Sequence, residues 1–94
     1  MRELVFTPNF ERSFRRVVGK NPALQPQIEQ TLRRMSENLA DARLKTHHLS
    51  GQLAGLHAGS VAYDCRIVFA KRKHPKTNAG GVILLNIGSH EAVH

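Results

Sequence analysis

The sequence predicts an α+β domain in which a short N-terminal strand and a helical hairpin precede an antiparallel-rich sheet. Two amphipathic helical stripes follow each other in the first half of the chain. Two apolar segments in the second half alternate like strands or are continuously apolar, and a loop with four cations separates them. This order, β-α-α-β-β-β, favours two helices packed as one layer on a sheet. The chain has 94 residues, enough for one core, so we expect a single domain over residues 1–94.

The first helix has clear start and stop signals. Residues 3–6 are a short strand candidate, and Thr7-Pro8 follows with an N-cap residue and a proline that suits the first helical position. Gly19 marks the expected end of the helix. Its apolar stripe has the helical spacing i, i+4, i+7 and i+8, and consists of Phe10, Phe14, Val17 and Val18.

The second helix repeats the cap-and-proline signal at Asn21-Pro22, but Pro26 leaves its start open between the two prolines. Its stripe has spacings of four, three and four, and consists of Ile28, Leu32, Met35 and Leu39. Two amphipathic helices with a short joint form a hairpin that needs an apolar layer to lie on.

The second half of the chain provides that layer. Residues 53–58 are a weak strand candidate, and Gly59-Ser60 is the expected turn. Residues 61–70 alternate over one long strand, with Cys65 on the expected core face and Arg66 on the other. Residues 71–81 are the expected hairpin tip, and residues 82–87 the return strand. The place of the N-terminal strand, at an edge or in the middle of the sheet, stays open.

The charge of the chain points to a polyanionic partner. It has 14 Lys+Arg against 7 Asp+Glu, a formal net charge of +7. Nucleic acid is the first candidate, an acidic protein the second and a membrane surface the third. One cysteine excludes an internal disulfide and is typical of a reducing cytoplasm. No apolar run has the length of a signal peptide or a membrane span, so we expect a cytoplasmic protein without a membrane partner.

The last five residues, from His90 to His94, spell the zinc-protease pattern His-Glu-x-x-His. That pattern binds zinc from a helix, and five residues at the end of this chain leave no room for one and no third ligand. We therefore expect no metal and no cofactor. Cys65 lies in mid-strand among core positions and is more typical of a buried side chain than of a nucleophile.

Arg66 is the most informative polar residue, because a guanidinium in mid-strand is costly to bury without a partner. Two interpretations are open. Arg66 forms a surface pair with Asp64 on the same strand face, or it lies in a groove and faces the C-terminal histidines. Lys45, His47 and His48 precede the strands in an expected loop. The expected loop cations Lys71, Arg72 and Lys73 could contact phosphates without sequence specificity.

Four motifs in order resemble the RelE/ParE toxin superfamily of bacterial type II toxin–antitoxin modules. They are Phe-x-x-x-Phe-x-Arg (residues 10–16), His-x-Leu-x-Gly-x-Leu-x-Gly (47–55), Tyr-Asp-Cys-Arg-Ile-Val-Phe (63–69) and Ile-Leu-Leu-Asn-Ile-Gly-Ser-His-Glu-x-Val (83–93). The likeness covers nearly the whole chain and is strongest to the YafQ-like branch. It implies a RelE-like fold and a metal-free endoribonuclease that cuts mRNA in the ribosomal A site, contacts 16S and 23S rRNA, and is silenced by an acidic antitoxin.

The resemblance also implies roles for individual residues. Arg66 matches the arginine placed against the scissile phosphate, and His90 and His47 match positions of catalytic side chains. Asp64 lies in a segment with site residues in that branch but does not align one to one. His94 stands where relatives have tyrosine or phenylalanine; histidine transfers protons near neutral pH but stacks on a base less well. Lys45, His48, Asp64 and the loop cations are expected to bind substrate.

Two other functions fit the same resemblance. A ParE-like toxin would inhibit DNA gyrase by protein contact without an RNase site. A degenerate module would bind an antitoxin and show no toxicity. The clustered histidines favour the RNase, since a toxin that only binds has no need of titratable groups.

Overall fold

The computed structural model describes residues 3–39, 41–49, 55–62, 64–73 and 80–88, with the backbone alone for His47, His48, Arg72 and Lys73. Its elements follow the predicted order, with one additional short strand before β3. The helices are α1 (Pro8–Lys20) and α2 (Leu24–Glu37), followed by the 3-10 turn η1 (Ala42–Leu44). The strands are β1 (Glu3–Phe6), β2 (His47–His48), β3 (His57–Ala62), β4 (Cys65–Lys73) and β5 (Gly80–Gly88).

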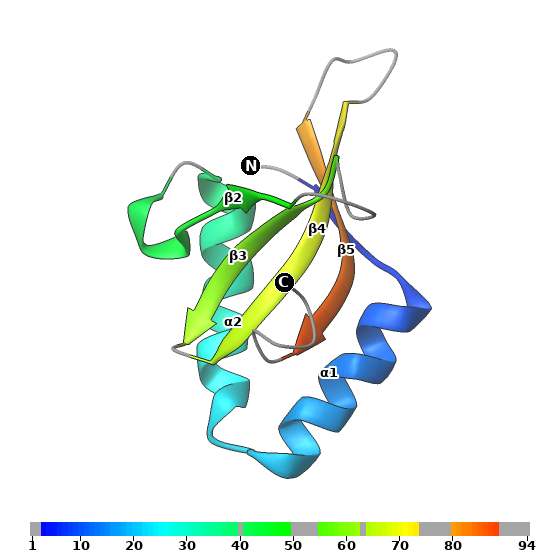
Figure 1. The fold of residues 1–94 in the computed structure, drawn as a ribbon, viewed down its shortest axis with the longest axis vertical. Coiled ribbons are helices and arrows are strands. Elements are labelled where there is room, and N and C mark those ends of the chain that lie inside the picture. Colours follow the sequence, from blue (N-terminus) through cyan, green and yellow to red (C-terminus); the bar gives the residue numbers. More distant parts are fainter. Residues whose placement is uncertain (1–2, 40, 50–54, 63, 74–79, 89–94) are drawn as a thin grey trace.

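The molecule has two layers, a helical hairpin and a five-stranded sheet (Figure 1). The strand order is β1-β5-β4-β3-β2, and neighbouring strands are antiparallel except β1 and β5. The N-terminal strand therefore lies at an edge, parallel to β5. Helix α1 packs along β5 and α2 packs against β3. The predicted α+β fold is confirmed.

The start of α1 is anchored to the sheet through its cap. The Thr7 hydroxyl accepts the Phe10 N–H at 3.2 Å and donates to the Leu84 carbonyl at 2.7 Å. Next to it, the Asn9 side-chain amide donates to the Leu85 carbonyl at 2.7 Å. One hydroxyl thus accepts a free N–H group of the first turn of α1 and also joins this end of the helix to β5. The predicted N-cap at Thr7 is confirmed.

Replacing Thr7 by alanine should lower the free energy of unfolding by about 1–2 kcal/mol, because it removes the cap and the bond to β5 together. Thr7→Ser keeps the hydroxyl and should retain most of the stability. Urea unfolding followed by circular dichroism measures both. Equal losses in the two variants would show that the threonine methyl, and not the hydroxyl, stabilises this joint.

Helix α2 begins at Leu24, between the two prolines that left its start open. Pro26 lies in the first turn, where a missing N–H costs no intrahelical bond. Ile28 and Met35 of the predicted stripe are fully buried, and Leu32 is half-buried against the core. Leu39 is buried too, although it lies beyond the end of the helix.

The main core fills the space between the helices and the sheet. Strand β4 contributes alternate residues to it, as its period of two predicts. The buried members are Phe10, Ile28, Met35, Leu39, Leu44, Cys65, Ile67, Phe69, Val82, Leu84 and Ile87.

The predicted turn at Gly59-Ser60 is wrong, because β3 continues through both residues to Ala62. A Cβ added at Gly59 would lie 3.6 Å from the Phe69 ring, an ordinary van der Waals contact, so this position lies beside the core. The chain turns instead at Asp64, and the long strand predicted over residues 61–70 is two strands of a hairpin.

The predicted loop over residues 71–81 is also wrong at both ends. Strand β4 continues to Lys73 and β5 begins at Gly80, so the three cations Lys71, Arg72 and Lys73 belong to a strand. Lys73 pairs with Gly80, so the hydrogen-bonded pairing of β4 with β5 continues into residues whose composition favoured a loop. The expected loop at His47-His48 is likewise a short edge strand, paired with β3.

A bulge in β5 changes which side chains reach each face of the sheet. Phe69 lies opposite Leu84 and Val68 opposite Asn86, so Leu85 is the extra residue. Leu84 and Ile87 stay in the main core, while Leu85 packs on the far face in a second cluster with Val68. The bulge therefore sets the register of the last residues of β5, which lead to the candidate site.

Candidate functional site

Arg66 lies near the start of β4, on the face of the sheet that the helices leave uncovered. Its neighbours Cys65 and Ile67 are in the main core, so alternation directs Arg66 to the opposite face with Val68. It pairs with Ser60 on β3 and with Gly88 on β5. Arg66 is thus in the middle of a three-strand row. The prediction that Arg66 lies in a strand with its side chain away from Cys65 agrees with this position, but Arg66 lies near the start of the strand and not in its middle.

The guanidinium of Arg66 is half-buried, and its Nε has no hydrogen-bond partner among the described residues. A buried donor on a charged group costs free energy when no acceptor is present. Such groups in folded proteins usually have a partner, which can be a protein atom, an ordered water or a bound ion. Arg66 therefore has the properties of an anion-binding side chain, and a phosphate oxygen is a suitable acceptor.

Gly88 lies opposite Arg66 on β5. Because glycine has no Cβ, no side chain from this position lies next to that of Arg66. His90 follows two residues later in the sequence. Both His90 and His94 lie outside the described residues.

The backbone of His47 lies two cross-strand rows from that of Arg66 and two strands away from it, on β2. His47 is opposite Ala58, Ala58 is opposite Val68, and Val68 is opposite Asn86. The β2 edge strand thus brings His47, which is distant from Arg66 in the sequence, into the same sheet, two rows from Arg66.

The predicted substrate-binding residues are distributed over several places. Lys45 is exposed in a left-handed conformation (φ 48°) directly after η1. Lys71 is exposed, and its odd separation from Arg66 along β4 directs it to the other face of the sheet. His48 lies opposite His57 at the edge of the sheet. Arg72 and Lys73 lie in β4, as described above.

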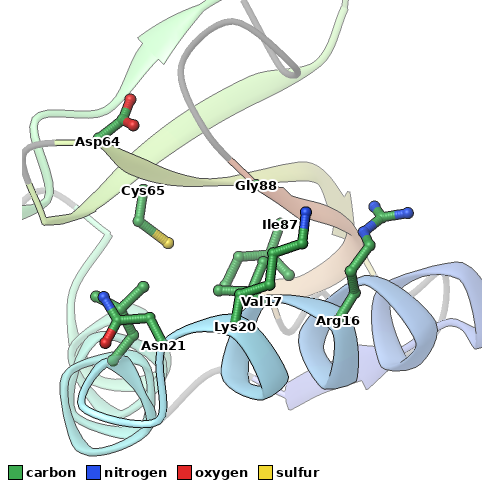
Figure 2. A pocket seen from close by; sticks show the side chains of 9 residues that line it. Arg16, Val17, Lys20, Asn21, Asp64, Cys65, Ile87 and Gly88 are labelled. Carbon is green, nitrogen blue, oxygen red and sulfur yellow. The ribbon is translucent and has the colours of Figure 1, made fainter.

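Asp64 is exposed in the β3–β4 turn, so the prediction that it shares a strand face with Arg66 is wrong. It lies at the rim of a pocket of about 470 Å³ between the helical layer and the end of the sheet (Figure 2). The Cys65 thiol points into this pocket from β4. Burial, and secondarily the charge of Asp64, raises the pKa of the Cys65 thiol. The thiol is therefore held neutral, as expected of a buried side chain.

Sequence reasoning missed two features. The cations Arg16 and Lys20 were not among the predicted site residues, yet they line this pocket. Their spacing of four residues was the available signal. His57 is buried, and its ring stacks on that of Phe69 with 5.4 Å between the ring centroids. The sequence did not indicate this burial, because His57 comes just before residues that have the composition of a turn.

Among the described residues, no group of three His, Cys, Asp or Glu side chains could hold a metal ion. Within the same residues, no helix is both long and apolar enough to cross a membrane.

The segment leading to Lys45 is shaped by an ion pair in η1. Asp41 caps this turn by accepting the Arg43 N–H at 2.9 Å and pairs with the Arg43 guanidinium at 2.7 Å. These hydrogen bonds lower the pKa of Asp41 to about 2.

Because the folded pKa of Asp41 is depressed, its contribution to stability is present above the ordinary carboxyl range and is lost as the pH falls through about 2. NMR titration of the folded protein should show a midpoint for Asp41 near 2, against an ordinary value of 3.8. Arg43→Gln should move the midpoint toward the ordinary value. An unchanged midpoint in that variant would assign the shift to the backbone N–H alone.

The fold of this chain matches those of several solved structures. YafQ from E. coli matches with a TM-score of 0.74 and 15% identity, covering 98% of this chain and 97% of that one. A YoeB/ParE toxin from Agrobacterium tumefaciens matches with a TM-score of 0.74 and 15% identity, covering 94% and 98%. The protein HP0894 from Helicobacter pylori matches with a TM-score of 0.72 and 24% identity, covering 97% of both.

The chain has the fold of the YafQ and YoeB toxins. The RelE-like fold that the resemblance implied is confirmed by these matches to YafQ and a YoeB/ParE toxin. Other matching structures hold YafQ in a complex with DinJ and YoeB in a complex with YefM. No family model and no curated protein sequence matches the chain.

Proposed function

We propose that this protein is the toxin of a type II toxin–antitoxin module and that it cleaves mRNA on the ribosome. The observation that carries the proposal is the half-buried Arg66, whose Nε has no acceptor among the described residues. It lies on the uncovered face of a YafQ-like sheet, beside the strand end that leads to His90.

The proposed reaction is attack of a ribose 2′-OH on the adjacent phosphate, without a metal ion. Arg66 binds the phosphate and stabilises the negative charge that develops in the transition state. One of His90 and His47 removes the proton from the attacking 2′-OH as general base, and the other donates a proton to the leaving 5′-oxygen as general acid while the bond from phosphorus to that oxygen breaks. His94 takes the position of the usual aromatic residue; it can transfer protons near neutral pH but stacks on a base less well than tyrosine or phenylalanine.

The substrate is held mainly through its phosphates. Lys45, His48, Asp64 and the β4 cations Lys71, Arg72 and Lys73 are the proposed contacts to mRNA and to 16S and 23S rRNA. The net charge of +7 supports binding to polyanions, and low aromatic content (5%) argues against a stacking platform.

The proposed partner is an acidic antitoxin in the cytoplasm. The structures of YafQ with DinJ and of YoeB with YefM support a partner of this class. Its acidic segment would complement the basic surface of this chain.

Induced expression followed by primer extension on a defined mRNA tests the function. We expect growth arrest and cleavage within translated codons, and no cleavage when translation is blocked. Toxicity of His90→Ala equal to that of the parent would contradict the assignment of His90.

Intact mRNA together with a DNA-damage response would overturn the RNase proposal and identify a gyrase-inhibiting toxin. No growth effect at all would identify a module that only binds its antitoxin.

A further inference from the structure

The last residues of β5 have a neighbouring strand on one side only. Strand β1 pairs with β5 as far as Phe6, which lies opposite Leu84. Strand β5 continues from there to Gly88 and pairs with β4 on its other side. The β1 side of residues 85–88 therefore needs other hydrogen-bond partners, because a buried backbone group without one costs free energy.

Helix α1 provides these partners through polar side chains. Next to the cap of the helix, the Asn9 side-chain amide donates to the Leu85 carbonyl at 2.7 Å. One turn further along the helix, the Ser13 hydroxyl accepts the Ile87 N–H at 3.2 Å. The bonded residues advance in the same direction along α1 and β5, so these side chains bind the edge of β5 as a parallel strand would.

Ser13 is a polar residue on the core-facing side of α1. It lies three residues after Phe10 and four before Val17, on the same side of the helix, and is only 2% exposed. Its hydroxyl donates to the Phe10 carbonyl at 2.9 Å and uses a lone pair to accept from Ile87. A buried hydroxyl is costly unless it is hydrogen-bonded, and these two bonds explain why serine is stable here.

The two contacts with α1 bind β5 at its bulge, one at Leu85 itself and one two residues later. Were Leu85 not an extra residue, Arg66 would lie opposite Ile87 and not opposite Gly88. A branched side chain would then stand in the row of Arg66, and His90 would follow that row by three residues and not by two. The contacts with α1 therefore hold the register on which the position of His90 depends.

We propose that Ser13 and Asn9 are positioning residues for the proposed cleavage. They hold the end of β5, and through it the segment that carries His90, in register with Arg66. Their role in cleavage rests on the proposed function, whereas their hold on β5 does not. Both belong to the helical layer, on the other side of the sheet from Arg66, so they act on turnover and not on substrate binding.

Hydrogen exchange measured by NMR tests the hold on β5 without any substrate. In Ser13→Ala, the Ile87 amide keeps Asn86 Oδ1 as an acceptor but loses the serine hydroxyl. Its exchange with solvent should become about tenfold faster, because the end of the strand opens more readily.

Thr31→Val is the matched control, because it too removes one buried hydroxyl and little else. Thr31 is 1% exposed, and its hydroxyl donates within α2 to the Gln27 carbonyl at 2.8 Å. Exchange at Ile87 should stay within about twofold of the parent in this variant.

Cleavage kinetics with varied concentrations of mRNA-programmed ribosomes test the consequence for the reaction. Ser13→Ala should lower kcat by about 10–100-fold and leave KM within about twofold, because a misplaced catalytic group slows the chemical step while the phosphate contacts persist. Ser13→Thr keeps the hydroxyl and should retain at least about a third of the parent kcat. Circular dichroism at the assay temperature checks that each variant is folded.

Asn9→Ala provides a second variant at an exposed position, where folding is less affected. It should lower kcat by about threefold to tenfold, again with KM nearly unchanged. Thr31→Val should keep kcat within about twofold of the parent.

The inference fails if exchange at Ile87 is unchanged in Ser13→Ala, or if Thr31→Val loses as much kcat as Ser13→Ala. A rise in KM with unchanged kcat also contradicts it and would make α1 part of the substrate-binding surface. An active parent together with a fully active Ser13→Ala removes the positioning role alone. A parent that cleaves nothing refutes the proposed function and the role in cleavage together, and the exchange measurement then decides the hold on β5 separately.

Discussion

Arg66→Met should reduce mRNA cleavage by about 100–1,000-fold, the usual effect of removing one group that stabilises transition-state charge. Primer extension in a translating extract, with protein concentration varied, measures the rate. Arg66→Lys should recover part of the activity, because an ammonium keeps the charge but not the planar pair of donors. Arg33→Gln removes an exposed cation from α2, in the other layer, and should leave the rate unchanged.

The same substitution should not destabilise the protein. Methionine removes a buried donor that lacks an acceptor among the described residues and packs with Val68 and Leu85 on the same face. Exchanging a buried charge for an apolar side chain is often neutral or stabilising, and we expect a change between zero and about +2 kcal/mol in unfolding free energy. A loss of more than about 1 kcal/mol would make Arg66 a structural residue and would undermine its proposed role.

Phe69→Ala should cost about 3–5 kcal/mol of unfolding free energy, because it opens a cavity at the centre of the core. Phe69 is fully buried, and the ring of His57 stacks on its ring. A domain of this size has about 5–14 kcal/mol of stability in total, so the variant should be marginal at growth temperature. Its melting temperature should fall by roughly 15–30 °C in differential scanning calorimetry.

Phe6→Ala is the matched control for this prediction. Phe6 is 48% exposed at the end of β1, and its ring contacts Phe10 at 5.8 Å. Its loss should cost about 1 kcal/mol or less. Equal losses in both variants would mean that the edge between β1 and α1 limits stability and that the central cavity is relieved by repacking.

The helices illustrate what local patterns can predict. Thr7, Pro8 and the stripe from Phe10 to Val18 placed α1 to within one residue, since capping and periodicity act over a few neighbouring residues. The core face of β4 followed from its period of two for the same reason. Cys65 was correctly placed in the core on that basis.

The hairpin boundaries illustrate where such patterns fail. Gly59-Ser60 has the composition of a turn, but both residues pair with β4, Gly59 with Ile67 and Ser60 with Arg66. Lys71 to Lys73 have the composition of a loop, but β5 provides a pairing strand. In both places the partner strand decided the structure, and it is distant in the sequence.

For the candidate site, too, some features follow from local sequence and others only from the tertiary structure. The sequence by itself determined that Arg66 stands in a strand with its side chain away from the core, and that the chain is strongly basic. Only the tertiary structure decided that its Nε has no acceptor among the described residues and that Gly88 lies opposite it. The tertiary structure likewise decided that His47 lies two rows away in the same sheet, and that Arg16 and Lys20 line a pocket. The physical reason is that side-chain direction within a strand is local, whereas strand order, the bulge at Leu85 and helix packing join residues far apart in the chain.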